Sequence, residues 1–441
     1  MFGAPEQGLF RVGLRKAGIF IREAHDVIQI VDSIGCGAIL TVPPAGITRT
    51  QCMRGRRGSQ NGMNTSLRIP LHTCADTALA KLAEATHSPG IAALDGATLL
   101  GERAMLGSMR IPGRTSAGGG CHLYDAVGDR VALNLARPAD RELLPALFAT
   151  DTLDIHDHTA IAARIGTSNA AALVQRGRSM GLAIAAELEV PPAPAGACVE
   201  LVKGQPAMAA PHAVPRVLDL SALWAGPLAG HLLWLAGAEV VKLESRTRRD
   251  VMRESDPTFY ALLNQGKAGV VIDLREADGR QALLALIATS DVVIEAARPR
   301  ALVQLGIDAA ELVRTTPGLV WVTITGHGAS GESAGWVGFG DDCGVAGGLT
   351  AALHAVSGHT GFVGDAIADP LTGMFAALVA WDAWASRRGG RFGVSMSAVV
   401  ANCLAEARER DSAGLESSLR DWSAAAGQPF PTVNRRPIGA L

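Results

Sequence analysis

The sequence predicts an α/β fold in which a parallel sheet carries helices on both faces and a smaller α/β unit precedes it. Residues 216–325 alternate short apolar strands with helical segments, a pattern typical of such a sheet. A proline-rich stretch at 191–197 cannot continue a helix, and it separates this part from an earlier α/β pattern at 113–190. The 441 residues are 48% apolar and 19% charged, which excludes a disordered chain and suffices for two or three domains.

The N-terminal part divides into two regions. Residues 1–62 mix short apolar runs with a basic, polar patch, so we expect an extension, disordered in one interpretation, with Met63 as an alternative start. Residues 63–190 are expected to form the smaller α/β domain. Its predicted elements are a strand at 131–135 and helices at 77–85, 95–109, 141–148 and 170–188.

The C-terminal part begins with a linker at 191–211, followed by the larger domain at 212–405 and a polar tail at 406–441. Apolar runs predict the strands of the larger domain at 217–220, 239–243, 270–274, 292–295 and 319–325. Helical patterns fall at 228–236, 279–289, 370–384 and 398–407, and a glycine-rich loop is expected at 326–348.

The chain shows no signal for a membrane or a nucleic-acid partner. The most apolar run, 223–241, is long enough to span a bilayer, but Pro227, His231 and Glu239 interrupt it, which favours a buried helix. Lys and Arg total 40 against 42 Asp and Glu, so no basic surface for nucleic acid is expected. The seven cysteines form no CxxC pair, which is typical of buried thiols in a reducing compartment, and we expect a cytoplasmic protein.

Asp369 stands directly before Pro370 at the start of a predicted helix. An Asp at this position is typical of an N-cap, because its carboxylate accepts the free amide hydrogens of the first turn. A helix N-terminus also favours the ionised carboxylate, which can act as a nucleophile. From the spacing alone the capping role is favoured, and the two roles are compatible.

Three other motifs have both a structural and a functional interpretation. Gly118, Gly119 and Gly120 form either a tight turn or a mobile lid, and the turn is favoured from the residues alone. Residues 326–331 match G-x-G-x-x-G, but no helical pattern follows, so a loop is favoured over a dinucleotide site. The histidines show no ligand spacing with carboxylates, and no metal is expected.

Several ordered blocks resemble the family III CoA-transferases. They are VLDLSALWAGPLAGHLLWLAGAEVVKLE (217–244), LNQGKAGVVIDL (263–274), VWVTITGHGASG (320–331) and VGDAIADPLTGMFAALVAW (363–381). GRTSAGGGCHLYDAVGDRVALNLARP (113–138) is similar to the family's glycine loop and small domain, which usually follow the CoA-binding half and here precede it. The resemblance implies a Rossmann-like CoA-binding domain with the smaller domain N-terminal to it.

The resemblance also implies a reaction and a site. Asp369 would be the nucleophile that transfers CoA between an acyl-CoA and a small carboxylic acid, through an aspartyl anhydride and an aspartyl-CoA thioester. Gly118, Gly119 and Gly120 would then be a lid that keeps water from these intermediates. Coenzyme A would be bound only as the acyl-CoA substrate, and the family implies a homodimer. The implied CoA contacts are Leu223, Trp224, Ala225, Arg246, Ile272 and Arg275.

Departures from the family pattern leave two alternatives open. Ala296, Ala297 and Gln304 replace an Asn, a Phe and an Arg of the family's CoA site, which favours a CoA-binding or oligomerisation protein without catalysis. The racemase branch of the family uses a His base where this chain has Phe339, which cannot carry a proton. We therefore favour the transferase over an acyl-CoA racemase or isomerase.

Overall fold

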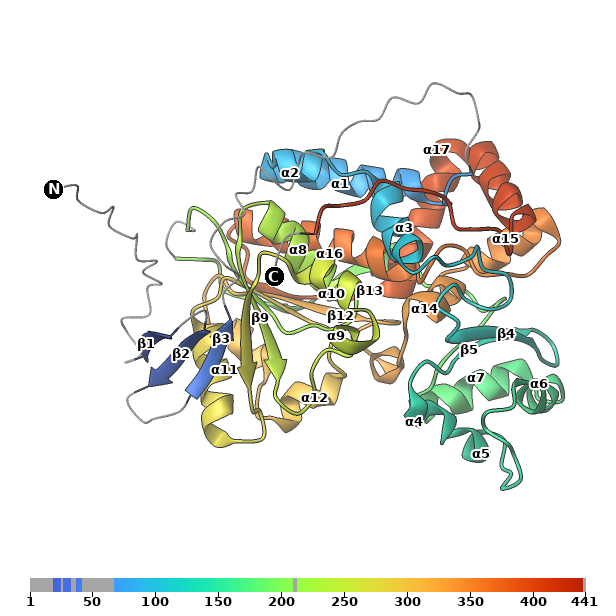
Figure 1. Cartoon of the computed structure of the whole chain (residues 1–441), viewed down its shortest axis with the longest axis horizontal. Coiled ribbons are helices and arrows are strands. Elements are labelled where there is room, and N and C mark those ends of the chain that lie inside the picture. Colours follow the sequence, from blue (N-terminus) through green and yellow to red (C-terminus); the bar gives the residue numbers. More distant parts are fainter. Residues whose placement is uncertain (1–18, 25–26, 33–36, 42–66, 209–211, 439–441) are drawn as a thin grey trace.

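The computed structural model describes residues 19–24, 27–32, 37–41, 67–208 and 212–438 (Figure 1). Its centre is a ten-stranded sheet in the order β1-β2-β3-β10-β9-β8-β11-β12-β13-β7. The six inner strands from β10 to β13 pair in parallel, which confirms the predicted parallel sheet. They are β8 (Arg216–Asp219), β9 (Glu239–Ser245), β10 (Ala268–Ile272), β11 (Val292–Glu295), β12 (Val320–Thr325) and β13 (Gly390–Ser395).

Helices cover both faces of this sheet, because alternate residues of each strand point to opposite sides. Val292 and Ile294 of β11 join the core under one helical layer, whereas Val293 between them joins the core under the other. The first layer contains α1 (His72–Thr86), α3 (Gly96–Leu106), α8 (Ala225–Leu235), α10 (Pro257–Asn264), α16 (Ala368–Ala385) and α17 (Met396–Ala424). The second contains α11 (Ala277–Ala288) and α13 (Ala309–Thr315).

The predicted buried helix in the apolar run is α8, which lies in the core of the first layer. None of the helices in the described part of the chain is both long and apolar enough to cross a membrane.

A smaller unit lies at the lower right of Figure 1 and has a core of its own. Its antiparallel sheet consists of β4 (Cys121–Asp125), β5 (Arg130–Asn134) and β6 (Ala183–Ala186), covered on one face by α6 (His158–Gly166) and α7 (Ala170–Ser179). The other face packs on α14 (Gly340–Ala346) of the larger body through a small apolar cluster. The smaller unit is therefore docked against the larger one.

The structure divides the chain differently from the sequence-based boundaries. Helices α1 and α3 lie in the core of the larger body, so the smaller unit excludes most of residues 63–112. The expected linker at 191–211 contains β7 (Cys198–Lys203), because a proline-rich segment is compatible with the start of an edge strand.

Both ends of the chain also differ from expectation. The expected tail at 406–441 begins inside α17, and its later part crosses α3, where Arg436 pairs with the buried Glu102 (Figure 1). Most of residues 1–62, and Met63 itself, lie outside the described residues. The described parts are β1 (Ile19–Ala24), β2 (Val27–Asp32) and β3 (Gly37–Thr41), and β3 pairs with β10.

Two local predictions were wrong. The predicted helix at 170–188 ends at Ser179 and is followed by β6, because AIAA gains a strand partner in β5. The expected loop at 326–348 contains α14, whose first turn is stabilised when Asp342 accepts the Phe339 N–H at 3.0 Å. The remaining short elements are α2 (Pro89–Ala92), α4 (Pro138–Arg141), α5 (Leu144–Leu147), η2 (Pro194–Ala197), α9 (Met252–Ser255), α12 (Pro299–Gln304), η3 (Glu332–Gly335) and α15 (Leu349–Ser357).

Candidate functional site

Asp369 lies in the first turn of α16, one position inside the helix. The residue before the helix is Ile367, so the predicted capping role of Asp369 was wrong. Its carboxylate instead accepts a hydrogen bond from the backbone of Ala225, at the start of α8. The residue remains partly accessible to solvent. A carboxylate at the meeting point of two helix N-termini, with some exposure, is placed where negative charge is favoured and a substrate can reach it.

The carboxyl group of Asp369 is poised between its two protonation states near neutral pH. Burial raises its pKa to about 7, Arg103 opposes this rise, and Asp341 adds to it. A group that titrates near the working pH supplies a substantial fraction of the reactive, ionised form.

Two glycines make room for this arrangement. A Cβ on Gly340 would lie 2.3 Å from Oδ2 of Asp369, so only glycine lets α14 approach the carboxylate so closely. A Cβ on Gly373 would lie 2.7 Å from the carbonyl oxygen of Ala225, so this glycine allows α16 and α8 to touch. The absence of a side chain at positions 340 and 373 therefore allows the helices around Asp369 to pack this closely.

Arg103 of α3 supplies positive charge to the site. Its Nη1 pairs with Oδ1 of Asp365 at 2.7 Å, and its guanidinium lies 5.6 Å from the centre of the Trp224 ring. The charges of four carboxyl groups act on this one guanidinium, those of Asp365, Asp341, Asp369 and Asp256. Burial raises the pKa of Asp341 to about 6 and also raises that of Asp365. The cluster therefore carries more acidic groups than Arg103 neutralises.

The predicted glycine run meets this cluster from the smaller unit. A Cβ on Gly118 would lie 3.2 Å from Nη2 of Arg103, and Gly119 has a φ of +76° that favours glycine. The Ser116 hydroxyl makes a side-chain hydrogen bond to Asp341. Gly118 and Gly119 are exposed, and Gly120 is partly exposed. The structure thus brings Gly118 next to the guanidinium that faces Asp369.

Leu223, Trp224 and Ala225 form the turn between β8 and α8. Leu223 has a φ of +68°, which is strained for a branched residue, and its N–H donates to Oδ2 of Asp250 at 3.1 Å. Trp224 is buried edge-on against Phe259, with 4.9 Å between the ring centres. Strained turns of this kind cluster at functional sites, and this one borders Asp369 through Ala225.

Arg246, Ile272 and Arg275 form a second group, at the ends of β9 and β10. The Arg246 N–H donates to the Ile272 carbonyl at 2.8 Å, and the exposed Arg275 pairs with Asp273. The Ile272 side chain is buried in the core of the second layer, which leaves its backbone as the part that could meet a ligand. Both groups follow the carboxyl ends of parallel strands, the edge where open α/β sheets bind ligands.

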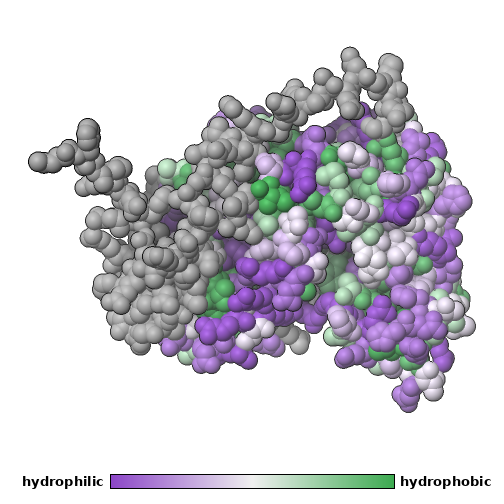
Figure 2. Space-filling view, in the orientation of Figure 1, coloured by the Kyte–Doolittle hydropathy of each residue, from purple (hydrophilic) through white to green (hydrophobic). Residues whose placement is uncertain are grey.

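A cluster of arginines that the sequence analysis missed lies at the same edge. Arg298 follows β11, and its pKa is lowered by partial burial and by the nearby charges of Arg137 and Arg248. Figure 2 shows a notch at the lower edge of the molecule, between the larger body and the smaller unit, with hydrophilic surface on both sides. Arginine binds phosphate through paired hydrogen bonds, so such a cluster suits a phosphorylated ligand.

The residues that depart from the family pattern lie around this edge. Ala296 and Ala297 follow β11, and Gln304 is exposed at the end of α12. The Phe339 ring lies 5.3 Å below the guanidinium of Arg137. Phe339 therefore contacts the arginine cluster and offers no group for proton transfer.

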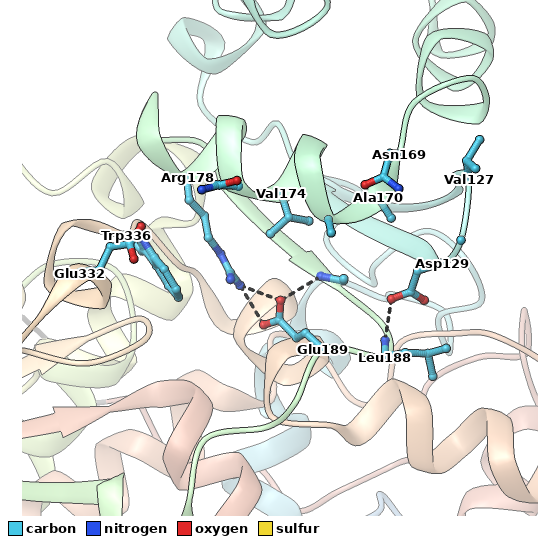
Figure 3. Close-up of a pocket in the computed structure, with 14 residues that line it drawn as sticks. Val127, Asp129, Asn169, Ala170, Val174, Arg178, Leu188, Glu189, Glu332 and Trp336 are labelled. Carbon is cyan, nitrogen blue, oxygen red and sulfur yellow. Dashed lines mark hydrogen bonds and ion pairs between the residues drawn. The ribbon is translucent and has the colours of Figure 1, made fainter.

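A separate pocket of about 530 Å³ lies between α7 and the segment before α14 (Figure 3). Arg178 crosses it, pairs with both oxygens of Glu189 at 2.8 and 3.0 Å, and lies 4.2 Å from the Trp336 ring centre. None of the predicted site residues lines this pocket. The candidate site is therefore the cluster of charged groups around Asp369 and Arg103, apart from this pocket.

Sequence reasoning missed Arg103, Asp341 and Gly340, although the residues carried weak signals. Arg103 lies in the helix predicted at 95–109, and Asp341 directly follows Gly340 in the sequence GFGDD. Their contacts with Asp369 join distant parts of the chain, and a single sequence does not reveal such contacts.

Comparison with known proteins relates part of the chain to a protein family. Residues 215–407 match the family described as CoA-transferase family III. The succinyl-CoA–D-citramalate CoA-transferase of Chloroflexus aurantiacus is 34% identical over 170 residues, 37% of this chain and 42% of that protein. The succinate–glutarate CoA-transferase of Agrobacterium fabrum is 31% identical over 174 residues, 36% of this chain and 44% of that protein. A solved structure of a hypothetical protein from Mycobacterium tuberculosis has 26% identity and a TM-score of 0.41, and covers 48% of this chain and 61% of that one.

A parallel α/β sheet with a partly exposed carboxylate at the carboxyl ends of its strands has the site where open α/β sheets bind ligands. Residues 215–407, less than half of the chain, are similar to CoA-transferase family III. The chain spans less than half the length of the two curated relatives, 42% and 44%.

Proposed function

We propose that this protein transfers coenzyme A from an acyl-CoA to a small carboxylic acid, with Asp369 as the covalent carrier. The observation that carries the proposal is the position of Asp369, which is partly exposed and hydrogen-bonded to the backbone of Ala225. The family of residues 215–407 supports it, since the relatives named above are CoA-transferases by name.

In the first half-reaction an Asp369 oxygen attacks the thioester carbonyl carbon. The carbon–sulfur bond breaks, the CoA thiolate leaves, and an aspartyl anhydride remains. The thiolate then attacks the Asp369 carbonyl carbon and releases the donor acid as its carboxylate, which leaves an aspartyl-CoA thioester. The acceptor carboxylate repeats these steps in reverse and restores the Asp369 carboxylate. A carboxylate is a weak nucleophile, so direct transfer to the acceptor acid would be difficult. Division of the transfer into two exchanges keeps the barrier of each step modest.

The residues around Asp369 have separate parts in this proposal. The backbone N–H of Ala225 and the guanidinium of Arg103 would stabilise negative charge that develops on oxygen. Gly118, Gly119 and Gly120 would close over the anhydride and exclude water. The arginines at 137, 248 and 298, together with Arg246 and Arg275, would hold the phosphates of CoA. The homodimer and the cytoplasmic location expected from the sequence belong to the same proposal.

A CoA-binding protein without catalysis is the second candidate. Ala296, Ala297 and Gln304 favour it, since they remove a polar group, an aromatic wall and a charge from the edge that would bind CoA. A racemase is disfavoured by Phe339, whose ring packs below Arg137 and offers no base.

Trapping of the acyl enzyme distinguishes these candidates. We expect incubation with a panel of acyl-CoA thioesters, followed by hydroxylamine, to leave a hydroxamate on Asp369 that peptide mass spectrometry detects. Asp369→Ala should abolish both the adduct and CoA transfer. Asp382→Ala is the matched control, because Asp382 lies on the same helix and is exposed. A folded protein that binds CoA and gives no adduct with any thioester would support the binding protein.

A further inference from the structure

Three side chains of types that bind metal ions in proteins lie close together at α14. His327 lies in the loop after β12, and Asp342 and Cys343 follow each other in α14. Among the described residues, His327, Asp342 and Cys343 place one ligand atom each within 4.8 Å of the others. Nε2 of His327 lies 3.9 Å from Oδ2 of Asp342, and Oδ2 lies 4.0 Å from Sγ of Cys343.

The imidazole of His327 is oriented as in a metal ligand. One ring nitrogen makes a hydrogen bond to the backbone of Val337, whereas Nε2 has no hydrogen-bond partner in the described structure. The His327 side chain is only 4% exposed, so water does not compensate Nε2 from the surface. A metal-ligating His typically gives its second nitrogen to a backbone carbonyl and directs the first at the ion. The separation of 3.9 Å from Asp342 is too long for a hydrogen bond, and a buried polar atom without a partner calls for an explanation.

Asp342 and Cys343 are also held in place by contacts with the surrounding protein. Oδ1 of Asp342 accepts hydrogen bonds from Nδ2 of Asn134 at 3.3 Å and from the Phe339 N–H at 3.0 Å, which leaves Oδ2 directed at the cluster. Sγ of Cys343 contacts the Gly326 carbonyl oxygen at 3.4 Å. Both residues are fully buried. The carboxylate is thus held by second contacts, as ligating carboxylates are.

A glycine keeps the space between these atoms open. A Cβ on Gly338 would lie 2.4 Å from Sγ of Cys343 and 2.9 Å from Nε2 of His327. Any side chain at 338 would therefore fill the space that the two ligand atoms share.

The nearby positive charge is already neutralised. Trp336 packs against the His327 ring with 5.9 Å between the ring centres, and Arg178 covers the Trp336 ring. Figure 3 shows Arg178 turned toward Glu189, with which it makes the paired hydrogen bonds described above. A cation at the cluster would thus face an ion pair rather than a free guanidinium.

We propose that His327, Asp342 and Cys343 form a three-ligand site for Zn²⁺. Nitrogen, carboxylate oxygen and thiolate sulfur are the ligands that Zn²⁺ takes in proteins, and three of them leave a fourth position for water. Binding forms bonds from zinc to Nε2, Oδ2 and Sγ and releases to solvent the thiol proton of Cys343 and the proton that burial favours on the Asp342 carboxyl, without a redox change. The ion would tie the loop after β12 to α14, the helix that carries Gly340 and Asp341. This site goes beyond the proposed transfer reaction and does not depend on it.

The test titrates the full chain, without a histidine tag and freed of metal by chelation, with Co²⁺ as a spectroscopic substitute for Zn²⁺. We expect one ion per chain, a thiolate-to-cobalt charge-transfer band, and displacement by Zn²⁺ with a rise in Tm. His327→Gln and Cys343→Ser should each weaken Co²⁺ binding by at least about 10-fold, since even outer contacts of metal ligands are worth that much. Cys198→Ser, which removes a thiol on β7, should leave the binding unchanged.

Two results would overturn the proposal. One is a wild-type protein that binds no stoichiometric Co²⁺ with a thiolate band. The other is binding that persists at full affinity in both ligand variants. The first measurement uses the wild-type protein alone, so it decides the matter even if a ligand variant fails to fold, and circular dichroism checks the folding of each variant.

Discussion

Asp369 and Arg103 show how a few charges set the reactivity of the whole site. The carboxyl group sits in a protein environment that disfavours its charge, and the guanidinium restores part of that charge. The balance between these effects places the pKa of Asp369 at about 7, within reach of ordinary cellular pH. The site therefore combines a carboxyl group that is easily protonated with a cation that controls how much of it is ionised.

The pH dependence of acylation follows from this balance. In the proposed reaction only the ionised carboxylate attacks, so we expect kcat/KM for adduct formation to rise as the pH increases through about 7 and then to level off. The free energy of unfolding should instead decrease as the pH increases over this range. The raised pKa means that the folded state binds the Asp369 proton more tightly than the unfolded chain, so this residue's contribution to stability is lost as the pH rises through about 7.

The variant Arg103→Gln tests how the guanidinium affects the pH profile. Removal of the guanidinium should raise the pKa of Asp369 further and move the rise in kcat/KM to higher pH. Arg164→Gln, an exposed change on α6, serves as the control. A profile that stays flat around pH 7 in the wild type, or does not move in Arg103→Gln, contradicts the role given to the pair.

At the scale of elements, the regular part of the sheet was predictable and the site was only partly so. The strand predicted at 292–295 is β11, and that at 239–243 lies within β9, because short apolar runs between helical patterns have few other interpretations. The strand β6 and the helix α14 were missed. AIAA suits a helix or a strand equally, and α14 contains two glycines that weaken its local preference. Both elements depend on partners that are distant in sequence.

The contact between α8 and α16 positions Asp369, and it depends on a small residue. Gly373→Ala would bring a Cβ to 2.7 Å from the Ala225 carbonyl oxygen and 3.0 Å from Cβ of Leu228. We expect the two helices to separate, at a cost of about 1–3 kcal/mol in the free energy of unfolding for overpacking. CoA transfer should fall as well, since Asp369 would move away from the Ala225 N–H.

Urea unfolding and acyl-transfer assays measure the two effects of Gly373→Ala. Gly335→Ala is the matched control, because a Cβ there meets nothing within 4 Å. Equal stability and equal turnover in Gly373→Ala and the wild type would show that the helices do not need this close approach.

At the scale of the whole molecule, the C-terminal segment of the described chain supports a helix of the site. The segment after α17 returns across α3, the helix that carries both Arg103 and Glu102. The Arg436 guanidinium donates to both Glu102 oxygens, and both side chains are buried. The sequence could not predict this pair, because its members are 334 positions apart and the C-terminal stretch has the polar, proline-containing composition of a tail.

Breaking this buried pair should destabilise the entire fold. Arg436→Leu leaves the Glu102 carboxylate buried without its partner, and we expect a loss of about 3–5 kcal/mol in the free energy of unfolding. The double variant Glu102→Leu/Arg436→Leu should lose less free energy of unfolding than Arg436→Leu alone, because neither charged group then remains buried without a partner. Denaturant unfolding of the four proteins of this cycle measures the coupling, and additive losses would contradict it.

The ion pair between Arg103 and Asp365 joins positions 262 residues apart, and it has a consequence for the order of synthesis. During translation, α3 and the glycine run emerge long before the segment that carries Asp369. Asp365 and Asp369 are thus synthesised after the guanidinium that they face. A chain that ends before Asp365 would carry Arg103 without the carboxyl group that pairs with it.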